Sequence, residues 1–342
     1  MSSTAARPGT PTLDQVASLA GVSRATVSRV VNDSPRVSPT AREAVRAAVE
    51  TLRYVPNRAA RSLVTRRTDT VALVLSESGT QLFSDPFFAS IVQGLSAHLA
   101  DTDRTLVLLA ARDRREQEKI GRYARQGHVD GVILLSLHSD DLLPGILASS
   151  RVPLVLSGRP LDGREVSYVD ADNAGGAAAA TRHLLAQGRT RIATITGPLD
   201  MVAGLDRYAG YRSALEAAGR TPDPDLVDGG DFGEVGGMRA MSRLLDRAPD
   251  LDAVFVASDP MAAGALQALR TAGRRVPDDV ALVGFDDAPL AQACDPPLTT
   301  VAQPLGEMTA LMLELLLRRI EDADAPVETR VCATHLVRRA SA

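Results

Sequence analysis

Two short helical patterns joined through a glycine, within residues 12–32 (TLDQVASLAGVSRATVSRVVN), constrain the fold more than any other feature of this chain. Thr12 and Gln15 have the spacing of a capping box at the start of the first helix. Gly21 suits the tight turn that follows, because glycine adopts positive φ without strain. Ser23 stands where the second helix needs an N-cap. The pattern predicts a helix-turn-helix, whose second helix lies in the major groove of DNA.

Both predicted helices are amphipathic, so they can pack against each other. The apolar faces are Val16, Ala17, Leu19 and Ala20 on the first helix and Thr26, Val27, Val30 and Val31 on the second. Facing outward on the second helix we expect Arg24, Ala25, Ser28, Arg29 and Asn32. Most of these residue types can reach base edges or phosphates. An ordinary helical hairpin with a solvated face is the alternative.

The distribution of charge favours DNA binding over a solvated hairpin. Residues 1–67 contain eleven arginines and only four acidic residues, a net charge of +7, whereas the whole chain carries −4. Residues 68–342 therefore carry −11. A basic module joined to an acidic body is typical of a protein that holds DNA with one part and keeps the other part away from it.

The length of 342 residues predicts two or three domains. No apolar run in the sequence approaches the length of a membrane span, and the first residues lack the apolar core of a secretory signal. We therefore expect a cytoplasmic protein with no membrane partner and with a disordered tail over residues 1–11. Cys294 and Cys332 are expected to remain free thiols in a reducing compartment.

A third helix should complete a small all-α head over residues 12–56, since Ser38 and Pro39 have the order of an N-cap and a first helical residue. Residues 57–69 are basic and have little apolar surface. Such a segment is marginal as an isolated helix, so it is predicted to be a linker or a helix that forms conditionally.

From residue 70 to residue 338 the pattern changes to strands that alternate with helices. The expected strands are 71–75, 105–109, 131–135, 152–156 and 167–171, then 191–196, 225–229, 252–258 and 279–287. Continuous Val, Ile and Leu runs indicate strands buried on both faces, in parallel sheets covered by helices. We predict an α/β body of two doubly wound parallel-sheet lobes, with a ligand cleft at the carboxyl ends of the strands.

Motifs along nearly the whole chain resemble those of the lactose-repressor/galactose-repressor (LacI/GalR) family of bacterial transcription factors. They include LDQVASLAGVSRATVSRVVN (13–32), DGVILL (130–135), R-x-x-G-Y (207–211), ASDPMAAGAL (257–266) and VPDDVALVGFDD (276–287), in the family's order. The resemblance implies a homodimer that binds a pseudo-palindromic operator in double-stranded DNA. It also implies a body of periplasmic-binding-protein type that binds a small-molecule effector. The whole protein is then expected to be a transcriptional regulator, most simply a repressor.

By the same analogy, the two lobes have discontinuous boundaries. Lobe one is expected at about 70–170 and 304–325, and lobe two at about 171–303 and 326–338. No leucine-heptad tail follows the last predicted strand, so we expect a dimer and no tetramer.

The resemblance also assigns the residues at the DNA. Arg24 and Ala25 stand at the two positions that the family uses most for base choice, and for Arg24 a bidentate guanine contact and a phosphate clamp both stay open. The other contacts expected from the head are Thr12, Ser23, Thr26, Ser28, Arg29 and Asn32. The matching hinge-helix contacts are Asn57, Arg58, Ala60 and Leu63. Leu63 matches the leucine that the family inserts between base pairs in the minor groove.

Eight residues of the body are expected in the effector cleft. They are Phe87, Phe88, Ser157, Asp170, Arg207, Phe232, Ser258 and Asp286. The guanidinium of Arg207 and the carboxylate of Asp286 suit vicinal hydroxyls, which both donate and accept hydrogen bonds. A sugar effector is therefore favoured, with a purine-type corepressor as the alternative. Asp286 could instead cap a strand end, and Phe232 could be a core residue.

Other classes of function lack support in the sequence. Neither a phosphate-binding G-x-x-x-x-G-K-[ST] loop nor a G-x-S-x-G nucleophile elbow is present. The five histidines, His98, His128, His138, His183 and His335, have no metal-ligand spacing. We expect no enzyme activity, no cofactor and no metal. A sugar-binding transport module or a sugar-metabolising enzyme would have no use for the basic head.

Overall fold

The computed structural model describes residues 11–31, 36–54, 67–77 and 85–342. The chain separates into two compact units, Met1–Thr68 and Asp69–Ala342, which are called the head and the body below. Within the described ranges, no helix combines the length and the apolar character needed to cross a membrane.

The described head is built from three helices. They are α1 (Leu13–Ala20), α2 (Arg24–Val31) and α3 (Pro39–Leu52). The Thr12 amide donates to Gln15 Oε1 (2.8 Å), and the Gln15 amide donates to Thr12 Oγ1 (3.4 Å), so the predicted capping box is confirmed. Gly21 has a φ of 65°, the left-handed conformation that the turn between α1 and α2 requires.

A small apolar core holds the head together. Its buried members are Val16, Ala17, Val27, Val30, Val45, Ala48 and Tyr54. The prediction that Leu19 belongs to the inward face is wrong, because 53% of this residue is exposed. At about 100° per residue, Leu19 lies roughly 110° around α1 from the centre of the Val16–Ala17–Ala20 face, which puts it outside the contact with the other helices.

The body contains two six-stranded sheets, one in each lobe. The first has the order β11-β5-β4-β3-β1-β2 and the second the order β12-β10-β9-β8-β6-β7. The strands of the first are β1 (Thr70–Leu75), β2 (Thr105–Ala110), β3 (Gly131–Leu135), β4 (Leu154–Ser157), β5 (Ser167–Ala171) and β11 (Thr329–Cys332). Those of the second are β6 (Ile192–Thr196), β7 (Val227–Gly229), β8 (Ala253–Val256), β9 (Ala281–Asp286), β10 (Thr299–Ala302) and β12 (His335–Val337). All neighbours are parallel except β10 and β12, which confirms the predicted parallel architecture.

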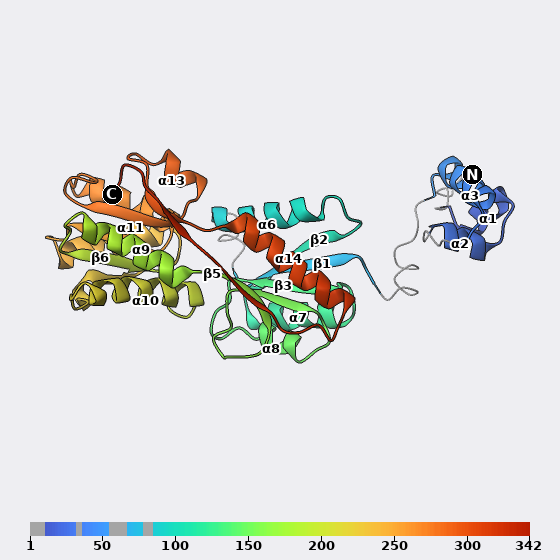
Figure 1. The fold of residues 1–342 in the computed structure, drawn as a ribbon, viewed down its shortest axis with the longest axis horizontal. Helices are drawn as coiled ribbons and strands as arrows, with labels where there is room; N and C mark the ends of the chain where they lie inside the picture. The colour runs from blue at the N-terminus through green and yellow to red at the C-terminus, as the bar shows by residue number, and fades with distance from the viewer. Residues whose placement is uncertain (1–10, 32–35, 55–66, 78–84) are drawn as a thin grey trace, which may run out of the picture. The chain divides into compact units, whose positions relative to one another are not determined.

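Helices cover both faces of each sheet, so each lobe has two apolar cores. The first lobe carries α6 (Pro86–Leu99), α7 (Arg114–Arg125), α8 (Leu143–Ala148) and α14 (Leu305–Glu321). The second carries α9 (Asn173–Ala186), α10 (Val202–Ala217), α11 (Glu234–Arg247), α12 (Asp259–Thr271), α13 (Pro289–Ala293) and a short 3-10 turn, η1 (Pro224–Leu226). In Figure 1, α14 returns to the first lobe and runs alongside α6.

The chain crosses between the lobes three times, after β5, after β10 and after β11 (Figure 1). The sequence placed residues 326–338 in lobe two as a single stretch, and this is wrong for the first part of that stretch. β11 pairs with β5 in the first sheet, and only β12 joins the second. The division follows from packing, because Cys332 is buried in the core of the first lobe whereas Leu336 packs against the core of the second.

Close packing of α11 against α12 depends on two glycines. A Cβ atom at Gly264 would lie 1.9 Å from the carbonyl oxygen of Glu234, and one at Gly237 would lie 2.2 Å from that of Met261. We expect Gly264→Ala to lower the free energy of unfolding of the body by about 1–3 kcal/mol, because backbone must move to admit the methyl group. Urea denaturation measures the change.

Gly306→Ala in α14 is the matched control. A Cβ there meets no heavy atom within 4 Å among the described residues, so the higher helix propensity of alanine should stabilise the body by up to about 1 kcal/mol. Equal effects of the two substitutions would show that helix propensity, and not the close contact, governs Gly264.

Candidate effector cleft and DNA-binding surface

A cleft of about 820 Å³, a volume that includes its part open to solvent, lies in the body and is lined by residues of both lobes. All eight residues expected in an effector site belong to its lining: Phe87, Phe88, Ser157, Asp170, Arg207, Phe232, Ser258 and Asp286. The fold thus brings together positions spread over some two hundred residues of sequence. Most of them stand at or just beyond the carboxyl end of a strand, where ligands of parallel α/β sheets bind.

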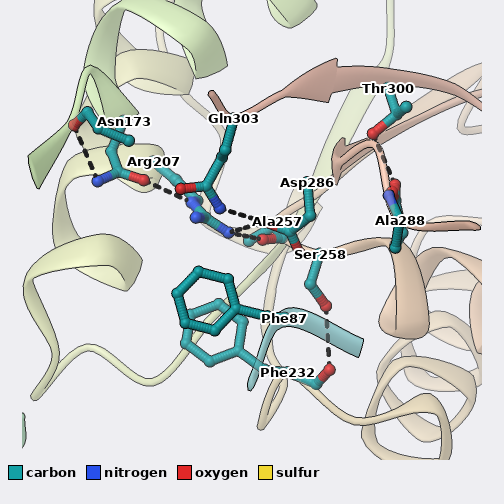
Figure 2. A network of polar contacts seen from close by, with 12 residues as sticks. Phe87, Asn173, Arg207, Phe232, Ala257, Ser258, Asp286, Ala288, Thr300 and Gln303 are labelled. Carbon is teal, nitrogen blue, oxygen red and sulfur yellow. Dashed lines mark hydrogen bonds and ion pairs between the residues drawn. The ribbon is translucent and has the colours of Figure 1, made fainter. Parts of the chain in front are cut away.

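Arg207 of α10 is the centre of the polar contacts in the cleft, as Figure 2 shows. Its Nε donates to Asn173 Oδ1 (2.8 Å), and its Nη1 donates to the carbonyl oxygen of Ala257 (2.6 Å). Nη1 also lies 3.3 Å from Asp286 Oδ1. No hydrogen bond that joins Arg207 to another described residue uses Nη2.

Aromatic rings hold the guanidinium of Arg207 in place. The Cζ atom of Arg207 lies 3.7 Å from the ring centroid of Phe285 and 5.7 Å from that of Phe232, both within the range of cation–π attraction. In Figure 2, the rings of Phe87 and Phe232 lie on the same side of Arg207. Phe87 and Phe88 meet edge to face, with centroids 5.5 Å apart. The cleft therefore combines apolar walls with one fixed cation.

Asp286 ends β9 and forms the acidic partner of Arg207. Gln303 Nε2 donates to Asp286 Oδ1 at 2.7 Å. Burial raises the pKa of Asp286 to about 6, although the nearby Arg207 opposes the shift. Asp286 has a φ of 113° and Asp287 one of 53°, a strained backbone for residues other than glycine. Strain of this kind persists where surrounding contacts over-determine a conformation, and in this conformation the Asp286 carboxylate lies against Arg207.

Asp170 of β5 forms a second buried carboxylate, linked to Arg207 through an amide. Its Oδ1 accepts from the Ala171 amide (2.8 Å) and from Asn173 Nδ2 (3.0 Å), and its Oδ2 accepts from the Arg159 amide (3.2 Å). Burial raises the pKa of Asp170. Asn173 therefore bridges the carboxylate and the guanidinium, and fixes the orientation of both.

Ser258 and Phe232 shape the wall of the cleft in the second lobe. Ser258 Oγ donates to the Phe232 carbonyl (3.0 Å) and accepts from the Met261 amide (3.3 Å), which caps α12. Phe232, expected to be either a wall or a core residue, is both, since it lines the cleft and packs against the core of the second lobe. Gly197 gives its ring room, because a Cβ at Gly197 would lie 2.2 Å from Phe232 Cζ.

Several polar residues line the cleft that the sequence did not predict: Glu77, Asp85, Arg159, Asn173 and Gln303. Most of them stand at a strand end, where the sequence predicted the ligand cleft. Glu77 follows β1, Asn173 follows β5, and Gln303 follows β10. Gln303 escaped notice because β10 was not among the expected strands.

In the head, the expected DNA residues divide into exposed side chains and helix caps. Arg24, Ala25 and Arg29 are exposed on α2, and Thr26 and Ser28 are half-buried. Ser23 Oγ accepts from the Thr26 amide (3.1 Å), as the predicted N-cap should. The remaining expected contacts, Asn32 in the head and Asn57, Arg58, Ala60 and Leu63 in the hinge, lie outside the described residues.

The fold and the cleft define a class, a two-lobed ligand-binding body of the periplasmic-binding-protein type joined to a helix-turn-helix head. The sequence profile of bacterial regulatory proteins, lacI family, matches residues 12–57, and that of the periplasmic binding protein-like domain matches residues 181–342. Among the described residues, no group of three or more His, Cys, Asp or Glu side chains could hold a metal ion.

Curated relatives agree with the profiles. The HTH-type transcriptional regulator CelR of Thermobifida fusca is 54% identical over 97% of this chain and 98% of its own length. The regulator GalR of Escherichia coli is 37% identical over 96% of this chain and 95% of its own length. The chain therefore belongs to the LacI/GalR family of DNA-binding transcriptional regulators.

Solved structures show the same fold. A complex of the transcriptional regulator CelR with cellobiose has a TM-score of 0.79 and 51% identity, over 97% of this chain and 100% of that one. The lac repressor dimer bound to operator and the anti-inducer ONPF has a TM-score of 0.86 and 27% identity, over 97% and 99%. The relatives named here are transcriptional regulators, and none of them is an enzyme.

Removal of Arg207 should make stability depend on pH in a defined way. We expect Arg207→Gln to lower the free energy of unfolding by about 3 kcal/mol at pH 7.5, because it leaves Asp286 buried without its cation. A carboxyl whose folded pKa is raised contributes stability at low pH that is lost as pH rises through that pKa. Without Arg207 this pKa rises further, so the variant should lose less relative to wild type at pH 5.

Arg212→Gln is the matched control on the same helix, α10. Arg212 forms an exposed ion pair with Glu216 one turn away, so its loss should cost no more than about 0.5 kcal/mol at either pH. Urea denaturation of both variants at pH 5 and pH 7.5 gives the comparison. If Arg207→Gln lowered the free energy of unfolding equally at the two pH values, the buried charge of Asp286 would not be the cause of the loss.

Proposed function

We propose that this protein is a cytoplasmic homodimeric repressor, and that a neutral sugar bound in the cleft releases it from a pseudo-palindromic operator. Residues 12–56 and the hinge residues 57–69 supply the DNA contacts, and the body binds the effector. The observation that carries the proposal is the cleft itself, in which a fixed guanidinium and buried carboxylates stand among three phenylalanine rings.

The chemistry of the cleft suits a sugar ring. A pyranose has C–H groups on its faces and hydroxyls around its rim. Phe87, Phe88 and Phe232 offer apolar walls for the faces. Arg207 Nη2 can donate to a hydroxyl, and the carboxylates of Asp170 and Asp286 can accept from one. Ser157 and Ser258, which also line the cleft, remain part of the proposed effector site.

The charge of the cleft favours a neutral ligand over an anionic one. Four carboxyl groups, from Glu77, Asp85, Asp170 and Asp286, line it. Two guanidinium groups, from Arg159 and Arg207, accompany them, and both already form ion pairs with aspartates. A phosphate ester would meet an excess of carboxylate, which raises the electrostatic cost of binding. Free sugars should therefore bind in preference to sugar phosphates or nucleotides.

Cellobiose is the first ligand to test, because a relative 51% identical to this chain was solved in complex with it. A purine-type corepressor stays the alternative within the family, since a neutral nucleobase could also stack on the phenylalanines. The two differ in sign as well as in chemistry. An inducer weakens operator binding, whereas a corepressor strengthens it.

The test uses the purified full-length protein and a fluorescent DNA fragment from its own promoter region. Fluorescence anisotropy at fixed salt follows binding, with random DNA as the reference. Titration with cellobiose, glucose 6-phosphate and guanosine should release the operator with cellobiose alone. Release by none of them, or tighter binding with guanosine, would overturn the sugar assignment. A lack of preference for the promoter fragment over random DNA would overturn the assignment as a repressor.

Gly197→Ala should disturb the sugar site without removing a polar group. The added methyl group would push the Phe232 ring towards the ligand space, since only 2.2 Å separates the two carbon positions. We expect calorimetry to show cellobiose affinity at least about tenfold lower, because an overpacked site costs roughly 1–3 kcal/mol. Gly306→Ala in α14 is the control and should bind like wild type. Unchanged affinity in Gly197→Ala would exclude Phe232 from the ligand wall.

Arg24→Ala distinguishes the two roles left open for that side chain. If Arg24 reads guanine, the loss should be about 1–3 kcal/mol on the operator and should relax specificity at one base pair. If it clamps phosphate, affinity should fall similarly on operator and random DNA. Arg46→Ala on α3 offers an exposed arginine as the control for general loss of charge. We expect the first outcome, measured by anisotropy on operator variants.

A further inference from the structure

Polar contacts tie the two lobes together beside the cleft. His138, in the loop after β3 of the first lobe, has its Nδ1 2.7 Å from Oδ2 of Asp200, which follows β6 of the second lobe. The backbones meet there too, in an isolated antiparallel bridge between His138 and Met201. Neither His138 nor Asp200 belongs to the described lining of the main cleft. Their contact thus joins lobe to lobe.

A second ion pair spans the lobes nearby. Arg159, after β4 of the first lobe, donates from Nη2 to Oδ1 of Asp206 in α10 of the second. Arg159 also lines the cleft, as does Val202 of α10. Two charged pairs therefore join loops of the first lobe to the chain between β6 and the middle of α10. None of the three segments that cross between the lobes contributes to them.

Three carboxylates lie close to His138, which shares a small pocket with Arg159 and Arg164. Its Nε2 lies 3.3 Å from Glu77 Oε1, at the end of β1, and Glu77 in turn accepts from Ser136 Oγ (2.6 Å). The His138 amide donates to Asp141 Oδ2 (2.9 Å) within the same loop. Of these three carboxylates, only that of Asp200 belongs to the second lobe. Residues 78–84, next to Glu77 in the sequence, include no charged side chain.

This environment keeps the imidazole protonated at neutral pH. The hydrogen bond to Glu77 raises the pKa of His138 to about 9; burial opposes that shift, and the hydrogen bond to Asp200 adds to it. Separation of the lobes would remove Asp200 and leave Glu77. The pKa of His138 must therefore be lower when the lobes part than when they meet.

We propose that the ion pair between His138 and Asp200 holds the lobes together over an occupied cleft, so that effector affinity depends on the charge of His138. The inference rests on the proposed sugar effector. A ligand that contacts both lobes binds the joined arrangement more tightly, and any contact that favours this arrangement raises apparent affinity. Near pH 9, His138 binds more protons when the lobes are joined than when they are apart. Effector affinity is therefore full at neutral pH and falls as pH rises through 9.

Calorimetric titration of cellobiose into full-length protein tests the pair at pH 7.5 and pH 10. We expect His138→Gln and Asp200→Asn each to weaken binding about two- to fivefold at pH 7.5, the range of a partly exposed ion pair. Wild-type affinity should fall by a similar factor at pH 10, and that of either variant should change less. The double variant should be no weaker than the singles, because both remove one interaction. His128→Gln is the control, an exposed histidine of the first lobe stacked on Tyr123.

A distance measurement separates this inference from the proposed effector. Spin labels at Lys119→Cys in α7 and Arg239→Cys in α11, with Cys294→Ser, report the separation of the lobes by pulsed electron resonance. Without ligand, His138→Gln should reduce the population with joined lobes, and His128→Gln should not. If cellobiose does not bind wild type, the sugar assignment fails and this comparison still decides the role of the pair. Distances and pH profiles of His138→Gln that match wild type would overturn the proposal.

Discussion

The buried positive charge of Arg207 is the constraint on which the body of this protein depends. A guanidinium withdrawn from water is costly unless its donors and its charge are matched. The Arg207 guanidinium donates to Asn173 and to the Ala257 carbonyl, and it forms an ion pair with Asp286. The Phe285 ring covers one face of the guanidinium. These partners come from α9, the end of β8 and the end of β9. One side chain thus contacts groups from several elements of the second lobe.

The acids around this charge outnumber it, and that excess gives the cleft its chemical character. Asp286, Asp170, Asp85 and Asp259 all lie close enough to stabilise the Arg207 cation. Burial raises the pKa of each of the four carboxyl groups, so they carry their charge at a cost. A hydroxyl that donates to such a carboxylate relieves part of this cost, whereas a phosphate would add to it. Partial desolvation of the carboxylates therefore favours a ligand that carries hydroxyl groups.

Much of this architecture follows from local sequence, because its signals are local. The capping box at Thr12, the glycine turn at Gly21 and the continuous apolar strand runs each depend on neighbours within a few residues. The errors lie where distant packing decides. Leu19 has the spacing of an inward residue and yet points away from α2 and α3, and the segment near 327–337 divides between two sheets because Cys332 and Leu336 fill different cores. In the cleft, family positions yielded Arg207 and Asp286, but the bridging roles of Asn173 and Gln303 exist only once several strand ends meet.

The position of those two amides bears on how occupancy of the cleft is transmitted. Asn173 stands just after the crossing that follows β5, and Gln303 stands in the crossing that follows β10. The third crossing is tied to the first, since the Asp172 amide donates to the Cys332 carbonyl and Thr334 Oγ1 donates to the Asp172 carbonyl. The groups that hold Arg207 and Asp286 are therefore attached to two of the segments that cross between the lobes. Under the proposed function, a ligand that contacts either charge would act on these crossings, and the contact of His138 with Asp200 would favour the joined arrangement of the lobes. Coupling between ligand and lobe arrangement thus requires no element beyond the residues of the cleft and its rim.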